Sequence, residues 1–258
     1  MLKTRCGPQS VPAHTGRAAI YLDLLSTDGR SVPAALAACH RSMDARSDVD
    51  VVLPSRLLSD QNAPAIEDLM HGAGFELGAT QQVNHELCVR LSRRQTLPDW
   101  VGAGMRTLIC GLNPSIHAAD MGVGFGRPGN RFWPAALEAG LVTEDRDPAL
   151  ALSESRLGMT DLVKRATRRA DELHPDEYRA GLRRVERLAA WLEPSVVLFV
   201  GLAGWRIAVD RKAAAGPQPD GIGGCRAYVM PSTSGLNAHS RIEDLVEHMK
   251  AVSRLAAS

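Results

Sequence analysis

The fold is most constrained by short apolar runs, each of which stops at a residue that breaks regular structure. Runs at 107–110, 196–200 and 226–230 have the length and composition of buried strands. Segments with helical periodicity separate them, the clearest at about 175–192, which opens with Pro175. This alternation predicts a parallel sheet with helices on both faces.

An amide side chain follows the first of these runs. Asn113 precedes Pro114, which turns the chain out of the sheet. Because open α/β sheets bind ligands at the carboxyl ends of their strands, we expect Asn113 to lie in a ligand-binding site. A glycine-rich loop around Phe125 then leads to an aromatic anchor, Asn-Arg-Phe-Trp, at 130–133. This combination suits a pocket for a flat polar ring.

A second loop makes the prediction specific. The run at 226–230 leads into Pro-Ser-Thr-Ser-Gly-Leu-Asn at 231–237, and a third segment lies at 158–167. With Gly-Leu-Asn-Pro at 111–114 and the anchor at 130–133, these segments resemble the mismatch-specific uracil/thymine DNA glycosylase family of the uracil-DNA glycosylase superfamily. The resemblance covers about residues 105–255 and implies a three-layer α/β domain with a parallel sheet.

The resemblance also implies an activity. It is that of a monofunctional DNA glycosylase in base excision repair, which hydrolyses the N-glycosidic bond of uracil, thymine or another damaged base opposite guanine. Water is the nucleophile, since no lysine stands where it would form a Schiff base. We expect double-stranded DNA with G·U or G·T mismatches as the partner, no metal or organic cofactor, and a monomer.

Two residues are candidates for catalysis. The resemblance gives Asn113 the role of positioning water, although an asparagine before proline can also simply cap a turn. An amide orients water but does not remove its proton at neutral pH. Asp161 stands where the family carries an amide or a lysine, and its carboxylate could accept that proton. The alternative is an acidic residue in the first turn of a helix.

The base-binding residues come from the same segments. Phe125 aligns with the ring that stacks on the flipped base, and the alternative is a loop side chain that covers the core. The glycines at 122–126 are expected to bring backbone N–H groups to the base edge. The resemblance assigns base contacts to Leu112, Phe125, Gly124 and Ser232.

The loop at 235–237 matches the segment that fills the gap left by the flipped base. Leu236 is the expected wedge, with Gly235 and Asn237 beside the orphan base. Phosphate contacts are assigned to Ser234 and to the basic cluster that includes Lys164 and Arg165. Such clusters are also often only solvated surfaces.

A small α/β unit precedes this domain. Residues 1–95 contain two strand-like runs, two helix-like segments and a final strand region at 75–91. That last region resembles the C-terminal strands of a class I methyltransferase, but the glycine-rich cofactor turn is missing. We therefore predict an accessory unit, a methyltransferase-like remnant, and expect residues 99–258 to hold the whole chemical site.

Composition excludes some classes of protein. The net charge of +1 shows no bulk basicity, so a DNA-binding surface must be local. No apolar run reaches the roughly 18 residues of a membrane span, and the N-terminus lacks the core of a secretory signal. Five scattered cysteines without a Cys-x-x-Cys pair argue against the iron–sulfur branches of the superfamily and fit a reducing cytoplasm.

Two other functions remain open. A non-catalytic module for binding damaged DNA could use the same pocket, because a site with only an amide is a weak catalyst. A methyltransferase or another nucleotide-cofactor enzyme is suggested only by the N-terminal unit.

Overall fold

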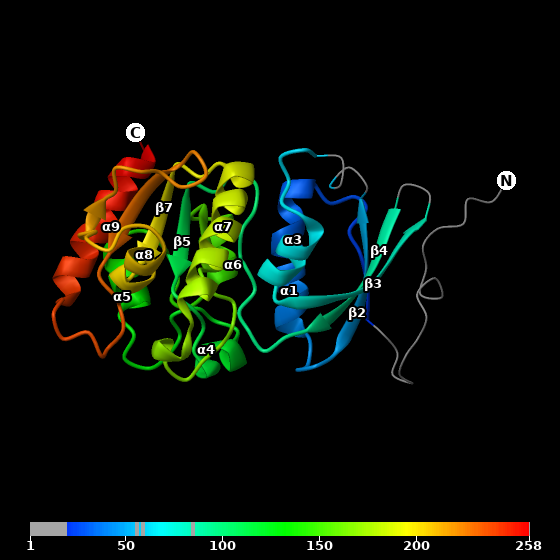
Figure 1. The fold of residues 1–258 in the computed structure, drawn as a ribbon, viewed down its shortest axis with the longest axis horizontal. Coiled ribbons are helices and arrows are strands. Elements are labelled where there is room, and N and C mark those ends of the chain that lie inside the picture. The colour runs from blue at the N-terminus through cyan, green and yellow to red at the C-terminus, as the bar shows by residue number, and fades with distance from the viewer. Residues whose placement is uncertain (1–19, 55–56, 58–59, 84–85, 258) are drawn as a thin grey trace.

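The chain forms two sheets, one in each half (Figure 1). The computed structural model describes residues 20–54, 57, 60–83 and 86–257. The C-terminal sheet has the strand order β6-β5-β7-β9-β8. Its strands are β5 (Thr107–Gly111), β6 (Leu157–Asp161), β7 (Val196–Val200), β8 (Gly216–Pro217) and β9 (Arg226–Met230).

Four of these strands run parallel, as the sequence predicts. β5 lies between β6 and β7, and β7 pairs with β9, whereas the short β8 is antiparallel to β9. The sequence pattern did not assign β6 as a strand. In the β5–β6 register Asp161 faces Gly111, so Asp161 stands at the carboxyl end of a strand. The alternative that placed it in the first turn of a helix is therefore wrong.

Helices cover both faces of this sheet. The helices α5 (Phe132–Glu138) and α9 (Ile242–Ala257) pack on one face, and α7 (Pro175–Leu192) and α8 (Leu202–Ala208) on the other. Short helices α4 (Ile116–Met121) and α6 (Pro148–Ser153) lie in the connections. The predicted three-layer α/β domain is confirmed. Within the described ranges, no helix is both long and apolar enough to cross a bilayer.

The N-terminal half is a smaller α/β unit. Its sheet has the order β1-β2-β4-β3, with β1 and β2 parallel and β4 antiparallel to both of its neighbours. The strands are β1 (Ile20–Asp23), β2 (Asp48–Pro54), β3 (Phe75–Val83) and β4 (Glu86–Arg93). Helices α1 (Val32–Ser42) and α3 (Ile66–Gly72) lie between this sheet and the C-terminal half (Figure 1).

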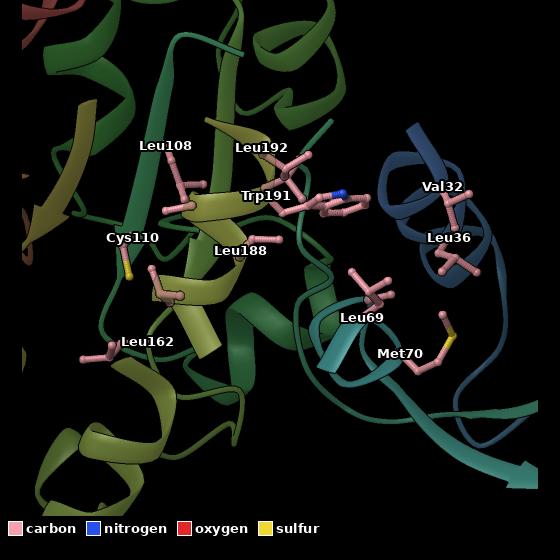
Figure 2. Close-up of a cluster of buried hydrophobic side chains, with 14 of the residues drawn as sticks. Val32, Leu36, Leu69, Met70, Leu108, Cys110, Leu162, Leu188, Trp191 and Leu192 are labelled. Carbon is pink, nitrogen blue, oxygen red and sulfur yellow. The ribbon is translucent and has the colours of Figure 1, made fainter. Parts of the chain in front are cut away.

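The two halves share one hydrophobic core. Leu36 of α1 and Leu69 of α3 are buried in the same cluster as Leu188 and Trp191 of α7 (Figure 2). A polar contact lies at the edge of this core: the indole N–H of Trp191 donates a hydrogen bond to the carboxylate of Asp60 at 2.9 Å. The N-terminal unit therefore covers an apolar face of the C-terminal half.

Candidate active site

The site is a cleft of about 730 Å³ at the carboxyl ends of the parallel strands. The segments that follow β5, β6 and β9 contribute to its lining, together with Val200 at the end of β7. Leu97, in the linker between β4 and β5 (residues 94–106), also lines it. This is the edge at which open α/β sheets bind ligands. The structure thus gathers at one place the three segments that the sequence analysis singled out.

Asn113 lies in this cleft with its amide held in one orientation. Its Nδ2 donates to the carbonyls of Pro114 and Arg165 at 3.1 and 3.0 Å and to Thr167 Oγ1 at 2.8 Å. Because two of these partners are carbonyls, the amide cannot be flipped. No donor among the described residues contacts Oδ1, which is therefore available to accept a hydrogen bond from a water.

Asp161 lines the same cleft and is nearly buried. Its carboxylate has no hydrogen-bond partner in the described part of the chain. Desolvation raises the pKa of this carboxyl to about 6; Lys164 and Arg184 act against that rise, and Asp99 adds to it. A side chain on Gly111 would collide with the carboxylate, so the glycine of the first motif leaves room for it. A carboxylate in this state can accept a proton near neutral pH.

Phe125 lies in the cleft with one face covered. Its ring stacks on that of Phe132, with centroids 4.2 Å apart and planes at 16°. Phe132 meets Trp133 edge to face, and the indole of Trp133 donates to the carbonyl of Gly124 at 2.8 Å. The anchor at 130–133 therefore fixes the Phe125 loop, and Phe125 both packs against the core and lines the cleft.

The glycines near Phe125 have distinct roles. Gly122 ends α4 in the left-handed conformation, and the N–H of Gly126 is bonded to Val123. Those two positions therefore do not have the predicted role of donors to a base. Gly124 lines a small cavity behind Phe125 and not the main cleft. Leu112 and Ser232 do line the cleft.

The wedge loop, residues 234–240, projects beside the cleft. The side chain of Leu236 is 85% exposed, an unusual position for a leucine, and it also borders the cleft. Gly235 packs against the backbone of Gly129, where a Cβ would come within 2.7 Å of the Gly129 carbonyl. Asn237 bonds Ser232 O through Nδ2 and accepts from His239 N, so its amide holds the loop.

Arg131 fixes the wedge loop from the other side. Its guanidinium donates to the carbonyls of Ser240, Ser234 and Asn237, the last two at 3.2 and 2.8 Å. The Arg131 N–H also donates to Thr233 O at 2.9 Å. One side chain of the aromatic anchor therefore holds both ends of the segment that carries Leu236.

The structure corrects the assignment of phosphate contacts. The Lys164 ammonium is buried and bonded to Asp99 at 2.7 Å, so it cannot reach a phosphate. Arg165 is paired with both carboxylate oxygens of Glu177 at 2.8 Å. Ser234 remains on the cleft wall. A charged stretch of sequence does not reveal which of its members are buried.

Two arginines of the cleft differ from Lys164 and Arg165 in being exposed and, among the described residues, unpaired, and one of them, Arg168, belongs to the same basic cluster. Arg127 and Arg168 are exposed and line the cleft, and neither has an ion-pair partner among the residues that the structure describes. Arg127 was not singled out from the sequence, and its position directly after the glycine loop was the signal that could have found it. Thr167, which bonds Asn113, was also missed, although it ends the third motif segment.

Comparison with known proteins agrees with this geometry. Residues 98–254 match the model of the uracil DNA glycosylase superfamily. The chain therefore belongs to that superfamily. A solution NMR structure described as a "putative Uracil DNA glycosylase" from Methanosarcina acetivorans is similar at 22% identity, with a TM-score of 0.45. That match covers 62% of this chain and 97% of the other.

Membership in the superfamily defines the class of reaction. The superfamily acts on DNA, and membership in it supports DNA N-glycosylase activity, the hydrolysis of the bond between base and sugar. In the described ranges, no three His, Cys, Asp or Glu side chains gather as a metal site would require.

Proposed function

We propose that this protein is a monofunctional glycosylase that excises uracil mispaired with guanine and leaves an abasic site. One observation carries the proposal: the free Oδ1 of Asn113, the carboxylate of Asp161 and the platform of Phe125 line one cleft beside the exposed Leu236. Thymine opposite guanine is a second candidate substrate.

The chemistry follows from what each group offers. The flipped base stacks on Phe125, with Phe132 supporting the ring from behind. Asn113 Oδ1 accepts a hydrogen bond from a water molecule and so orients it. This water attacks C1′ of the sugar as the glycosidic bond breaks. Asp161 takes the proton that the attacking water loses, and the base leaves as an anion that is later protonated.

DNA binding requires further contacts. Arg127 and Arg168 line the cleft, and we expect them to neutralise phosphates near the extruded nucleotide. Leu236 fills the space that the base leaves in the stack, which offsets part of the cost of unstacking.

The test is a panel of duplexes that carry uracil or thymine opposite guanine, uracil opposite adenine, and hypoxanthine. Release of the base is measured in single turnover, with and without alkali. We expect release from G·U, with strand breaks only after alkali. Tight binding of G·U without release of any base would instead indicate a non-catalytic damage-binding module.

A further inference from the structure

A buried ionic network lies beneath Asp161. Asp99, in the linker before β5, is 3% exposed. Its carboxylate accepts hydrogen bonds from Lys164 Nζ at 2.7 Å, Thr160 Oγ1 at 2.6 Å and Arg184 Nη1 at 2.6 Å. Two buried cations thus share one carboxylate, and one positive charge is left without a partner inside the network. Buried charges are stable only when they are compensated.

The network is joined to the backbone of Asp161. Arg184 Nη2 donates to the Asp161 carbonyl at 2.7 Å and to Thr160 Oγ1 at 2.9 Å. Arg184 comes from α7, which packs on one face of the sheet. A single guanidinium therefore connects Asp99 to the end of the strand that carries Asp161.

The N-terminal unit fixes Asp99. The N–H of Asp99 donates to the carbonyl of Gly72, the last residue of α3, at 2.8 Å. A side chain on Gly72 would collide with the Asp99 carboxylate, so the glycine permits this close approach. Thr96, also in the linker, donates its hydroxyl to the Lys164 carbonyl. The linker thus enters the catalytic half as an ordered part of its core.

We propose that Asp99 is a positioning residue for Asp161, which it serves by holding Arg184 in place and by balancing the charge of Lys164 and Arg184. This inference rests on the proposed role of Asp161 in activating water. It also gives the N-terminal unit a part in the chemistry, because α3 holds the linker where Asp99 reaches the network.

Charge balance predicts opposite effects for the two partners. Without the Asp99 charge, Lys164 and Arg184 are free to stabilise the ionised form of Asp161. Without the Lys164 charge, Asp99 repels that form and the carboxyl holds its proton more tightly. Among the described residues, the other groups that face this region include the buried thiol of Cys110 on β5, His40 on α1 and His71 on α3. Arg168 and Asp171 lie on the cleft wall. None of these changes in the variants below.

The experiment follows the Asp161 carboxyl by ¹³C NMR in the full-length protein, with Asp161→Asn to identify its signal. Asp99→Asn, Lys164→Met and the double variant are titrated beside wild type. We expect the midpoint to fall by about one pH unit in Asp99→Asn and to rise by about as much in Lys164→Met. The midpoint of the double variant should lie between those of the two single variants. The acidic limb of the single-turnover rate should move in the same order.

Several outcomes decide the matter. Equal midpoints in all variants, or shifts of the same sign in both single variants, would overturn the inference, because loss of packing alone gives no opposite pair. Should Asp99→Asn not fold, as shown by circular dichroism, a higher midpoint in Lys164→Met than in the double variant still supports it, and the reverse order refutes it. Shifted midpoints without base release would leave the inference standing and remove the proposed function. Base release without any shift in the titration midpoints would overturn the inference and leave the proposed function standing.

Discussion

Asn113 Nδ2 donates a hydrogen bond to Thr167 Oγ1 at 2.8 Å, so the loop after β5 is tied to the loop after β6. This contact uses the nitrogen of the amide and leaves its oxygen toward the cleft. The residue that we propose to orient water therefore also holds the site together.

Replacing Asn113 with alanine should lower single-turnover release of uracil by about 100-fold or more, the scale of a lost positioning group in catalysis. It also removes three donated hydrogen bonds and should cost about 1–3 kcal/mol of stability. Duplex binding should persist, since Arg127 and Arg168 are unchanged. Thr167→Val is the matched control: it loses one of the three contacts and should retain more activity. Excision at the wild-type rate by Asn113→Ala would reject the assignment.

Asp161→Asn should stabilise the protein above pH 6 and have little effect below pH 4. The folded-state pKa of Asp161 is raised from 3.8 to about 6 by burial. Between these values the folded state binds more protons than the unfolded one, so the free energy of unfolding falls as pH rises. At neutral pH, ionisation of the buried Asp161 lowers the free energy of unfolding by an amount on the order of 3 kcal/mol. The uncharged amide in Asp161→Asn removes this loss.

Thermal denaturation at acidic and neutral pH measures this difference. The same variant should lose the part of the pH–rate profile in which activity rises near pH 6, because no carboxylate then forms. A destabilised variant at neutral pH, or an unchanged acidic limb, would show that Asp161 is not the group that titrates there.

Much of this fold was predictable from sequence because strand and helix periods are local signals. The runs at 107–110, 196–200 and 226–230 and the helix at 175–192 all appear as predicted. The strand β6 was not predicted, because its sequence, Leu-Gly-Met-Thr-Asp, carries a glycine and a terminal carboxylate that weaken a strand pattern.

The site was predicted less completely, because its partners are distant in sequence. The loop positions of Asn113, Phe125 and Leu236 followed from motifs. The burial of Lys164 depends on Asp99, which lies 65 residues away along the chain. No local pattern distinguishes a lysine buried against such a partner from one on a solvated surface.

Leu236→Ala should weaken excision from duplex DNA more than from single-stranded DNA, which has no gap in a stack to fill. The loss should correspond to a few kcal/mol at most, the scale of unstacking one base. Because the side chain is 85% exposed, stability should change by no more than about 0.5 kcal/mol. Rates on matched uracil-containing duplexes and single strands measure the difference. A larger loss on single strands would contradict the wedge role.

Arg131→Lys should act through the same loop. An ammonium cannot donate at once to the carbonyls of Ser234, Asn237 and Ser240, so the wedge loop should lose its fixed position. We expect roughly a tenfold drop in excision from duplex, the scale of one hydrogen bond to a charged group.

A double-mutant cycle separates this effect from general damage to the fold. If Arg131 acts by placing Leu236, Leu236→Ala should cost less in the Arg131→Lys background than in wild type. Fully additive losses would show that the two residues act independently.

Removal of the N-terminal unit should destabilise the catalytic half, although none of the unit's described residues lines the cleft. A chain that begins at Gln95 keeps Thr96 and Asp99 but uncovers Leu188 and Trp191 of α7, which α1 and α3 bury in the intact protein. Each such side chain contributes about 1.5–3 kcal/mol through its burial. We expect the shortened chain to aggregate, as measured by gel filtration and light scattering.

The matched control carries Leu188→Glu and Trp191→Arg in the same shortened chain, which makes the uncovered face polar. This control should be soluble and should release uracil more slowly than the full chain, because the Asp99 N–H has lost the Gly72 carbonyl. A shortened chain that is soluble without these substitutions and excises uracil at the full rate would show that the N-terminal unit supports neither the fold nor the chemistry.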